Sequence, residues 1–124
     1  MSTIGNTIQS ADWKKEKHAP IIHVPEGIKV GEAFKVSVSI GDEIAHPNTL
    51  EHHIAWISLY FLAEGAKFPV QVAHAEFKAH GEGDIFTEPL AKVKLSLAKS
   101  GKFIAVSYCN IHGLWENELD VVVK

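Results

Sequence analysis

The residues best suited to chemistry lie close together near the C-terminal end, where two positions separate Cys109 from His112. This Cys-x2-His pair follows a predicted strand and occupies a short polar turn before Gly113. At this spacing a thiolate and an imidazole can converge on one metal ion. The alternative is a buried thiol beside a core histidine, because a lone cysteine is most often a small apolar residue. By itself, the pair leaves both interpretations open.

Three further histidines lie in polar segments of a chain that contains eight histidines among 124 residues. His18 follows two charged residues and precedes Pro20. His46 begins the run His-Pro-Asn, and His52 lies at the start of an apolar stretch. Adding these three imidazoles to the Cys-His pair favours a metal site with four nitrogen donors and one thiolate.

The remaining histidines are not expected to bind the metal. Neighbouring side chains on a strand point to opposite faces, so only one of His52 and His53 can face a given site. His74 and His80 share a predicted strand face with charged side chains, which indicates two solvent-exposed histidines. His23 lies between two apolar residues and is interpreted as structural.

The donor set indicates which metal would bind. Zinc usually has a closed tetrahedron of four ligands. A blue-copper site also uses two histidines and a cysteine, but its axial ligand is usually a methionine, and the only methionine here is Met1. Four nitrogens and a thiolate instead suit a five-coordinate ion with one open position, for which iron(II) is the natural candidate. Opposite a strongly donating thiolate, that position could accept a small oxygen species for reduction.

Strands must position these side chains, because alternating apolar patterns dominate the chain. Apolar residues recur at every second position in 34–40, 70–80 and 91–97, and further strands are predicted at 103–108 and 119–123. Residues 54–62 are apolar on both parities, as in a strand covered on two faces. No window shows sustained helical spacing. The prediction is an all-β antiparallel sandwich or barrel, with one domain over residues 1–124.

Composition narrows the classes of function. The net charge of −3 and the pI near 6.2 argue against a nucleic-acid-binding surface. A membrane span is not expected, because no run of about 18 apolar residues exists. The first residues contain no apolar stretch typical of a signal peptide, which predicts a cytoplasmic protein. A single cysteine excludes an intramolecular disulfide and a four-cysteine metal site.

Three segments resemble superoxide reductases of the single-iron neelaredoxin type, in the desulfoferrodoxin iron-binding domain family. They are 12–18 (DWKKEKH), 46–54 (HPNTLEHHI) and 107–116 (SYCNIHGLWE). The similarity runs in order and with compatible spacing from about residue 8 to the C-terminus. The additional four-cysteine iron domain of the two-iron relatives is not expected, because the chain has one cysteine.

The resemblance implies one mononuclear iron per chain, bound by four equatorial imidazoles and one axial thiolate. The implied ligands are His18, His46, His52, His112 and Cys109. The resemblance also implies that Glu16 occupies the sixth position in the resting ferric state and that Lys17 flanks the substrate site. The implied fold is an immunoglobulin-like β-sandwich of about seven strands, often assembled as a homotetramer.

The implied activity is one-electron reduction of superoxide to hydrogen peroxide, with electrons from rubredoxin or a similar small redox protein. Three alternatives stay open at this stage. An electron-transfer protein with an iron or blue-copper-like site would have no substrate. An immunoglobulin-like interaction module would have incidental histidines and no metal. A dismutase variant would turn over without an external electron donor.

Overall fold

The computed structural model describes residues 3–124, and its regular structure is almost entirely β-strand. The seven strands are β1 (Ile21–His23), β2 (Phe34–Ser39), β3 (Ile54–Ala63), β4 (Val70–Glu76), β5 (Leu90–Leu95), β6 (Gly101–Cys109) and β7 (Gly113–Val121). Two short helical segments are α1 (Ile4–Thr7) and the 3₁₀ turn η1 (Glu82–Asp84). The predicted all-β class is confirmed. Within residues 3–124, no helix has the length and apolar character needed to cross a membrane.

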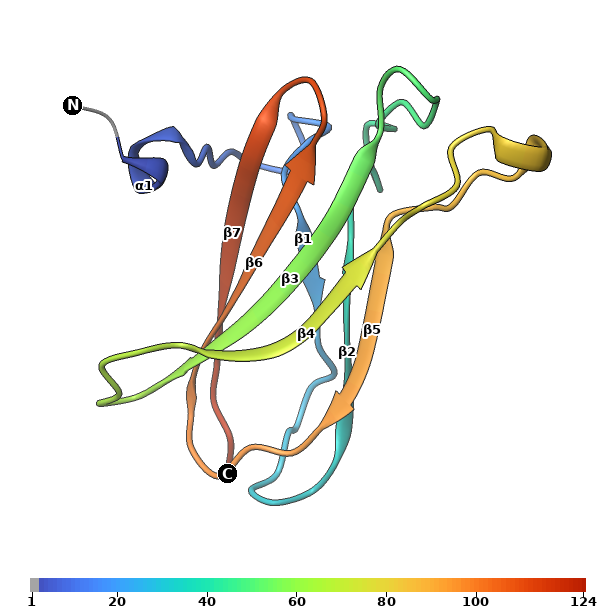
Figure 1. The fold of residues 1–124 in the computed structure, drawn as a ribbon. Coiled ribbons are helices and arrows are strands. Elements are labelled where there is room, and N and C mark those ends of the chain that lie inside the picture. The colour runs from blue at the N-terminus through green and yellow to red at the C-terminus, as the bar shows by residue number, and fades with distance from the viewer. Residues whose placement is uncertain (1–2) are drawn as a thin grey trace.

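The strands form two antiparallel sheets that pack as an immunoglobulin-like sandwich (Figure 1). One sheet has the order β1-β2-β5, and the other has the order β4-β3-β6-β7. Both sheets contribute to the core, in which Val36 and Val38 of β2 are buried together with Ile57, Leu59 and Phe103 of the larger sheet.

Alternation in the sequence explains which side chains face this core. In β6, Phe103, Ala105, Ser107 and Cys109 are all buried, and the residues between them are less so. Cys109 therefore lies on the inward parity of β6, at the last position of the strand. The central strand β3 has three consecutive buried residues, Ile57–Leu59, in agreement with its apolar character on both parities.

Two predicted strand limits were wrong. The last strand begins at Gly113 rather than at residue 119, because β7 pairs with β6 from Cys109↔Gly113 onward. The first half of β7 was not predicted because a half-exposed edge strand carries polar residues among its apolar ones, which obscures the alternating pattern. Strand β4 ends at Glu76, and the chain beyond it forms a loop rather than continuing to residue 80. The short strand β1 was not predicted.

Three segments meet at one end of the sandwich, the upper end in Figure 1. They are the segment before β1, the long connection between β2 and β3, and the turn between β6 and β7. The loop between β4 and β5 extends from the same end. Residues far apart in sequence are therefore neighbours there.

Candidate metal centre

Four imidazole rings lie around a common centre at this end of the molecule. Successive ring centroids are 4.7 Å apart for His18–His46, 4.7 Å for His46–His52, 5.0 Å for His52–His112 and 4.7 Å for His112–His18. The centroids of His18 and His52, which lie opposite each other in this arrangement, are 6.1 Å apart. Adjacent rings meet edge to face. The four side chains therefore have a nearly square arrangement, as equatorial ligands of one ion require.

The cysteine joins this arrangement from the core. Ligand atoms of His18, His46, His52 and Cys109 all lie within 4.8 Å of one another. Nδ1 of His112 lies 3.0 Å from Nε2 of His18 and 3.9 Å from Sγ of Cys109. The structure thus brings four of the predicted ligands into one group, here called the ligand group, and places the ring of His112 beside it.

The orientation of the rings suits metal binding. Nδ1 of His18 donates to the carboxylate of Glu16 at 2.6 Å, and Nδ1 of His46 donates to the carbonyl of Pro47 at 2.6 Å. With the proton on Nδ1, the lone pair of each ring lies on Nε2. Nε2 of His46 and Nε2 of His52 are buried and have no hydrogen-bond partner among the described residues. A metal ion would satisfy these atoms, so the donor set fits iron.

Burial favours the neutral form of two of these imidazoles, those of His46 and His52. It lowers the pKa of His46 to about 4, and the nearby charges of His18, His52 and Lys17 act in the same direction, against the hydrogen bond to Pro47. Burial likewise lowers the pKa of His52, with added contributions from His112, His18 and Lys17. Neutral imidazole is the form that binds a metal, so these two rings need no deprotonation near pH 7.

Glu16 and Lys17 lie at the edge of the ligand group. The carboxylate of Glu16 accepts hydrogen bonds from the backbone N–H and from Nδ1 of His18. Burial raises the pKa of Glu16, but these hydrogen bonds outweigh it and the net pKa is lowered. The carboxylate thus lies against the outer nitrogen of His18 rather than among the inward-facing donors. Lys17 is half-buried, and its positive charge contributes to lowering the pKa of both His46 and His52.

The tight turn between β6 and β7 places Cys109 and His112. Gly113 has a φ of +83°, a left-handed conformation that favours glycine and lets a short turn close after Cys109. The backbone N–H of His112 donates to Sγ of Cys109 at 3.4 Å, as expected for a sulfur ligand tuned by backbone hydrogen bonds. Asn110 links this turn to the His52 segment, because its side chain accepts from the N–H of His53 and donates to the carbonyl of Glu51, both at 2.9 Å.

A glycine allows the His46 segment to fold back on itself. Gly41 has a φ of +87°, and a Cβ at this position would lie 2.8 Å from the backbone N of His46. Any other residue would strain the backbone and collide with it. The loop that carries His46 therefore depends on Gly41 for its close approach.

Sequence reasoning assigned no role to Trp115 and Gln9, which support the site. The indole of Trp115 stacks on His18 with centroids 5.0 Å apart and an interplanar angle of 11°. Nε2 of Gln9 donates to the carbonyl of His112 at 2.9 Å. The proximity of Trp115 to His112 in sequence was an available indication. Gln9 is exposed and carries no sequence pattern that could have marked it.

The other histidines divide in a way that sequence parity predicted only in part. His53 lies outside the ligand group, in agreement with the expectation that one of the adjacent pair faces the site. His74 is exposed, as predicted. His80 is not: it is 3% exposed, and its ring stacks on that of His53. The prediction was wrong because β4 ends before His80, so strand parity no longer applies. His23 is exposed and bonds to Ser39 and Asp42.

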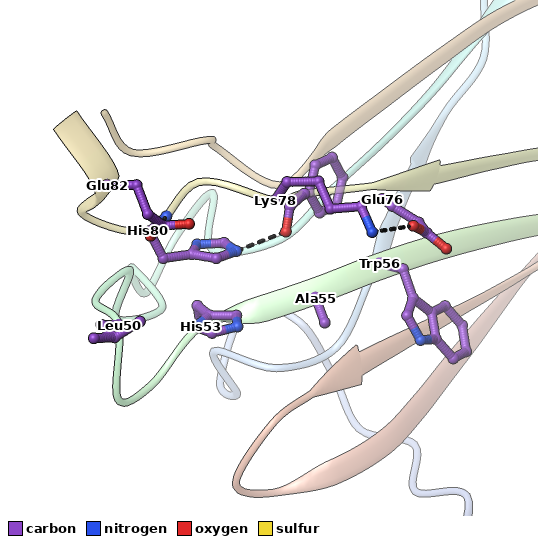
Figure 2. A pocket seen from close by; sticks show the side chains of 9 residues that line it. Leu50, His53, Ala55, Trp56, Glu76, Lys78, His80 and Glu82 are labelled. Carbon is purple, nitrogen blue, oxygen red and sulfur yellow. Dashed lines mark hydrogen bonds and ion pairs between the residues drawn. The ribbon is translucent and has the colours of Figure 1, made fainter. Parts of the chain in front are cut away.

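A surface hollow of about 330 Å³ lies beside the ligand group (Figure 2). His53 and His80 line one part of it, and Trp56 and the ion pair between Lys78 and Glu76 line another. None of the four residues of the ligand group lines this hollow. It therefore marks the flank of the centre and not the approach to it.

The protein is an immunoglobulin-like sandwich, and the loops at one end of it bring several imidazoles together beside one buried thiol. This combination is typical of a small metal-binding protein. Comparison with known proteins makes the class specific. Residues 10–118 match the desulfoferrodoxin family, and the chain belongs to that family. The resemblance seen in the three sequence segments is thereby confirmed.

Relatives match nearly the whole chain. A superoxide reductase of Pyrococcus furiosus is 54% identical to this chain. The match covers 94% of this chain and 97% of that protein. A neelaredoxin of Megalodesulfovibrio gigas is 46% identical, with coverage of 94% and 95%. The solved structure of the reduced superoxide reductase (neelaredoxin) of Archaeoglobus fulgidus superimposes with a TM-score of 0.87 at 50% identity, covering 94% of this chain and 99% of that one.

Proposed function

We propose that this protein is a superoxide reductase. The reaction joins one superoxide, one electron and two protons to form one hydrogen peroxide. The observation that carries this proposal is the ligand group, in which the buried Nε2 atoms of His46 and His52, unpaired within residues 3–124, converge with a fully buried thiol. It stands in a chain more than half identical to a protein named superoxide reductase.

The proposed cofactor is one iron per chain. Its ligands are His18, His46, His52, His112 and Cys109. The inclusion of His112 is supported by the 3.0 Å distance between its Nδ1 and Nε2 of His18, since two ring nitrogens so close together suit two ligands of one ion. When bound, the iron would supply the redox couple and a place where superoxide can bind and be reduced.

Three residues of the chain orient or tune the proposed ligands, or attract the substrate. Glu16 holds the proton of His18 on Nδ1 and so keeps Nε2 free to bind metal. The backbone N–H of His112 withdraws electron density from Sγ of Cys109. Lys17 provides a positive charge near the ligand group that attracts a small anion. In the resting oxidised state we propose a second place for the Glu16 carboxylate, as the sixth ligand, which requires it to leave His18.

Three further properties belong to the proposal. Electrons come from rubredoxin or a similar small redox protein. The chain forms one iron-binding domain over residues 1–124 and assembles as a homotetramer. A cytoplasmic location is supported by the single thiol, because reducing compartments keep such a ligand from oxidation.

The decisive experiment measures superoxide consumption and hydrogen peroxide yield with the iron-loaded protein, with and without a reductant. A superoxide reductase consumes superoxide only while reductant is supplied, and it yields one hydrogen peroxide per superoxide. A dismutase needs no reductant and yields one hydrogen peroxide for every two superoxides. An electron-transfer protein consumes no superoxide at the metal, and an interaction module retains no iron. Any of these last three results would overturn the proposal.

A further inference from the structure

His80 is the least exposed histidine of the buried set, at 3% against 5% for His18, although it lies outside the ligand group. A buried imidazole needs partners for its ring nitrogens, because unpaired polar atoms in the interior are costly. Nδ1 lies 2.9 Å from Oδ1 of Asn48, and Nε2 lies 2.7 Å from the carbonyl oxygen of Phe77. Both nitrogens are therefore engaged, and the orientation of the ring is determined.

The contact with Asn48 has a defined direction. The amide nitrogen of Asn48 donates to the carbonyl of Thr87 at 3.1 Å, so its oxygen is the atom that faces His80. Both atoms that face the ring nitrogens of His80, Oδ1 of Asn48 and the carbonyl oxygen of Phe77, are therefore acceptors. Asn48 is two residues from His46, so this hydrogen bond connects the His46 segment to the loop between β4 and β5.

The face of the His80 ring contacts a second segment, the one that contains His52 and His53. The rings of His53 and His80 stack with centroids 3.6 Å apart and an interplanar angle of 6°, as Figure 2 shows from the side. His53 is the sequence neighbour of His52, and its Nδ1 donates to the carbonyl of Thr49 at 2.9 Å. One buried side chain thus contacts two residues that lie within two positions of His46 and His52, both members of the ligand group.

We propose that His80 is a positioning residue, which sets the separation of His46 and His52 by holding Asn48 with its edge and His53 with its face. The inference rests on the metal centre proposed above. A positioning residue is needed because both ligands, His46 and His52, lie on the connection over residues 40–53, which contains no strand or helix. Ordering such a segment costs conformational entropy, and a fixed external contact reduces the part that metal binding must supply.

The backbone of His80 is anchored as well, which makes it a firm support. Its N–H donates to the carboxylate of Glu82 at 3.0 Å, and His80 forms an isolated antiparallel bridge with Phe86. The loop between β4 and β5 is therefore closed on itself where it meets the ligand-bearing connection.

The test compares Co²⁺ binding by the metal-free wild type and by His80→Phe, which keeps a stacking ring but removes both polar contacts. We expect Co²⁺ affinity to fall about 10- to 100-fold, as for residues that orient metal ligands, with a shifted cobalt–thiolate absorption band. The matched control is His74→Phe, because His74 lies on β4 and bonds to Ser58 without contacting the ligand segments. It should change the affinity by no more than about twofold.

A second variant separates positioning from general stability. Asn48→Ala removes the same hydrogen bond from its other end, together with the bond from Asn48 to the carbonyl of Thr87, and circular dichroism of each metal-free variant reports whether the fold is retained. If the two residues act through their shared contact, the loss of affinity in the double variant should be smaller than the product of the two single losses, whereas independent effects multiply. Should His80→Phe not fold, Asn48→Ala alone decides.

The outcomes are distinguishable. Wild-type affinity and an unchanged absorption band in folded His80→Phe, or in folded Asn48→Ala when the first variant does not fold, would overturn the positioning role and leave the metal centre intact. An equal loss in His74→Phe would overturn it too. Failure of the wild type itself to bind Co²⁺ or iron would overturn the proposed function.

Discussion

The carboxylate of Glu16 accepts two hydrogen bonds from His18, one from the backbone N–H at 2.9 Å and one from ring Nδ1 at 2.6 Å. The second bond assigns the ring proton to the outer nitrogen and leaves Nε2 for the metal. The same carboxylate is proposed as the sixth ligand of the oxidised centre. We therefore propose for Glu16 an orienting role and a ligating role that it cannot fulfil at the same time, and substitutions can separate them.

Replacing Glu16 by alanine and by glutamine should have different consequences. Glu16→Gln retains an acceptor for Nδ1 of His18, so its metal affinity should stay near that of the wild type. Glu16→Ala should bind iron about 10-fold more weakly, because His18 loses its orienting partner. Both variants should change the resting ferric spectrum and increase its response to azide or cyanide, with little change in the rate at which the ferrous protein meets superoxide. A ferric spectrum unchanged at every pH in both variants would exclude Glu16 as a ligand.

Replacing Cys109 by serine should abolish the reaction but not all metal binding. The hydroxyl has a similar volume and the four imidazoles stay in place, so iron should still bind in part. The thiolate-to-iron charge-transfer band and the reductase activity should both disappear, because the strong axial donor is gone. Absorption spectroscopy and superoxide consumption measure the two effects. Near-normal reduction by Cys109→Ser would show that Cys109 is not the axial ligand.

Lys17 should affect the rate of superoxide capture through its charge. Superoxide is a monoanion and the chain carries a net charge of −3, so electrostatic guidance must be local. For Lys17→Ala we expect the second-order rate to fall about 5- to 30-fold, with iron content and the charge-transfer band unchanged. The wild-type rate should also decline with ionic strength, and less steeply in the variant.

The control for this prediction is Lys15→Ala, which removes an exposed charge from the same segment. Its rate and salt dependence should match those of the wild type. Stopped-flow or pulse-radiolysis measurements over a salt series compare the three proteins. Equal rates and equal salt slopes for wild type and Lys17→Ala would remove Lys17 from the mechanism.

The metal-free protein should lose stability as the solution is acidified. Burial lowers the pKa of His46 to about 4, whereas its value in the unfolded chain is near 6.5. Between these values the unfolded state binds more protons, so the free energy of unfolding falls as pH falls from about 6.5 to about 4. The contribution of His46 is on the order of 2 kcal/mol, after allowance for partial exposure.

Urea unfolding of metal-free wild type and of His46→Gln at several pH values measures this effect. Glutamine does not titrate, so the variant should show a shallower decline; some decline stays, because burial lowers the pKa of His52 as well. An identical pH slope in both proteins would contradict the assignment to His46. Bound metal should add stability near neutral pH and add less as acid protonates its ligands.

Periodicity predicted most of the strands, though not β1 or the first half of β7, and residue type predicted the identity of the clustered side chains. Adjacency allowed only one of His52 and His53 at the site, whereas Cys109 was expected in the turn after the strand and is in fact its last residue. The prediction for the two histidines agrees with the structure because it depends on local geometry, in which strand residues alternate between faces. The segments containing His18, His46 and His112 were also sufficient to identify the family.

Contacts between distant segments were decided only by the tertiary structure. His80 looked like a surface residue in an alternating run, yet it is buried against His53 and Asn48, since the chain leaves β4 at Glu76 and turns toward the connection between β2 and β3. Likewise, Trp115 stacks on His18 although the two residues are 97 positions apart in the sequence. Such pairings depend on how the two sheets and their end loops pack together, and no local periodicity in the chain encodes that packing.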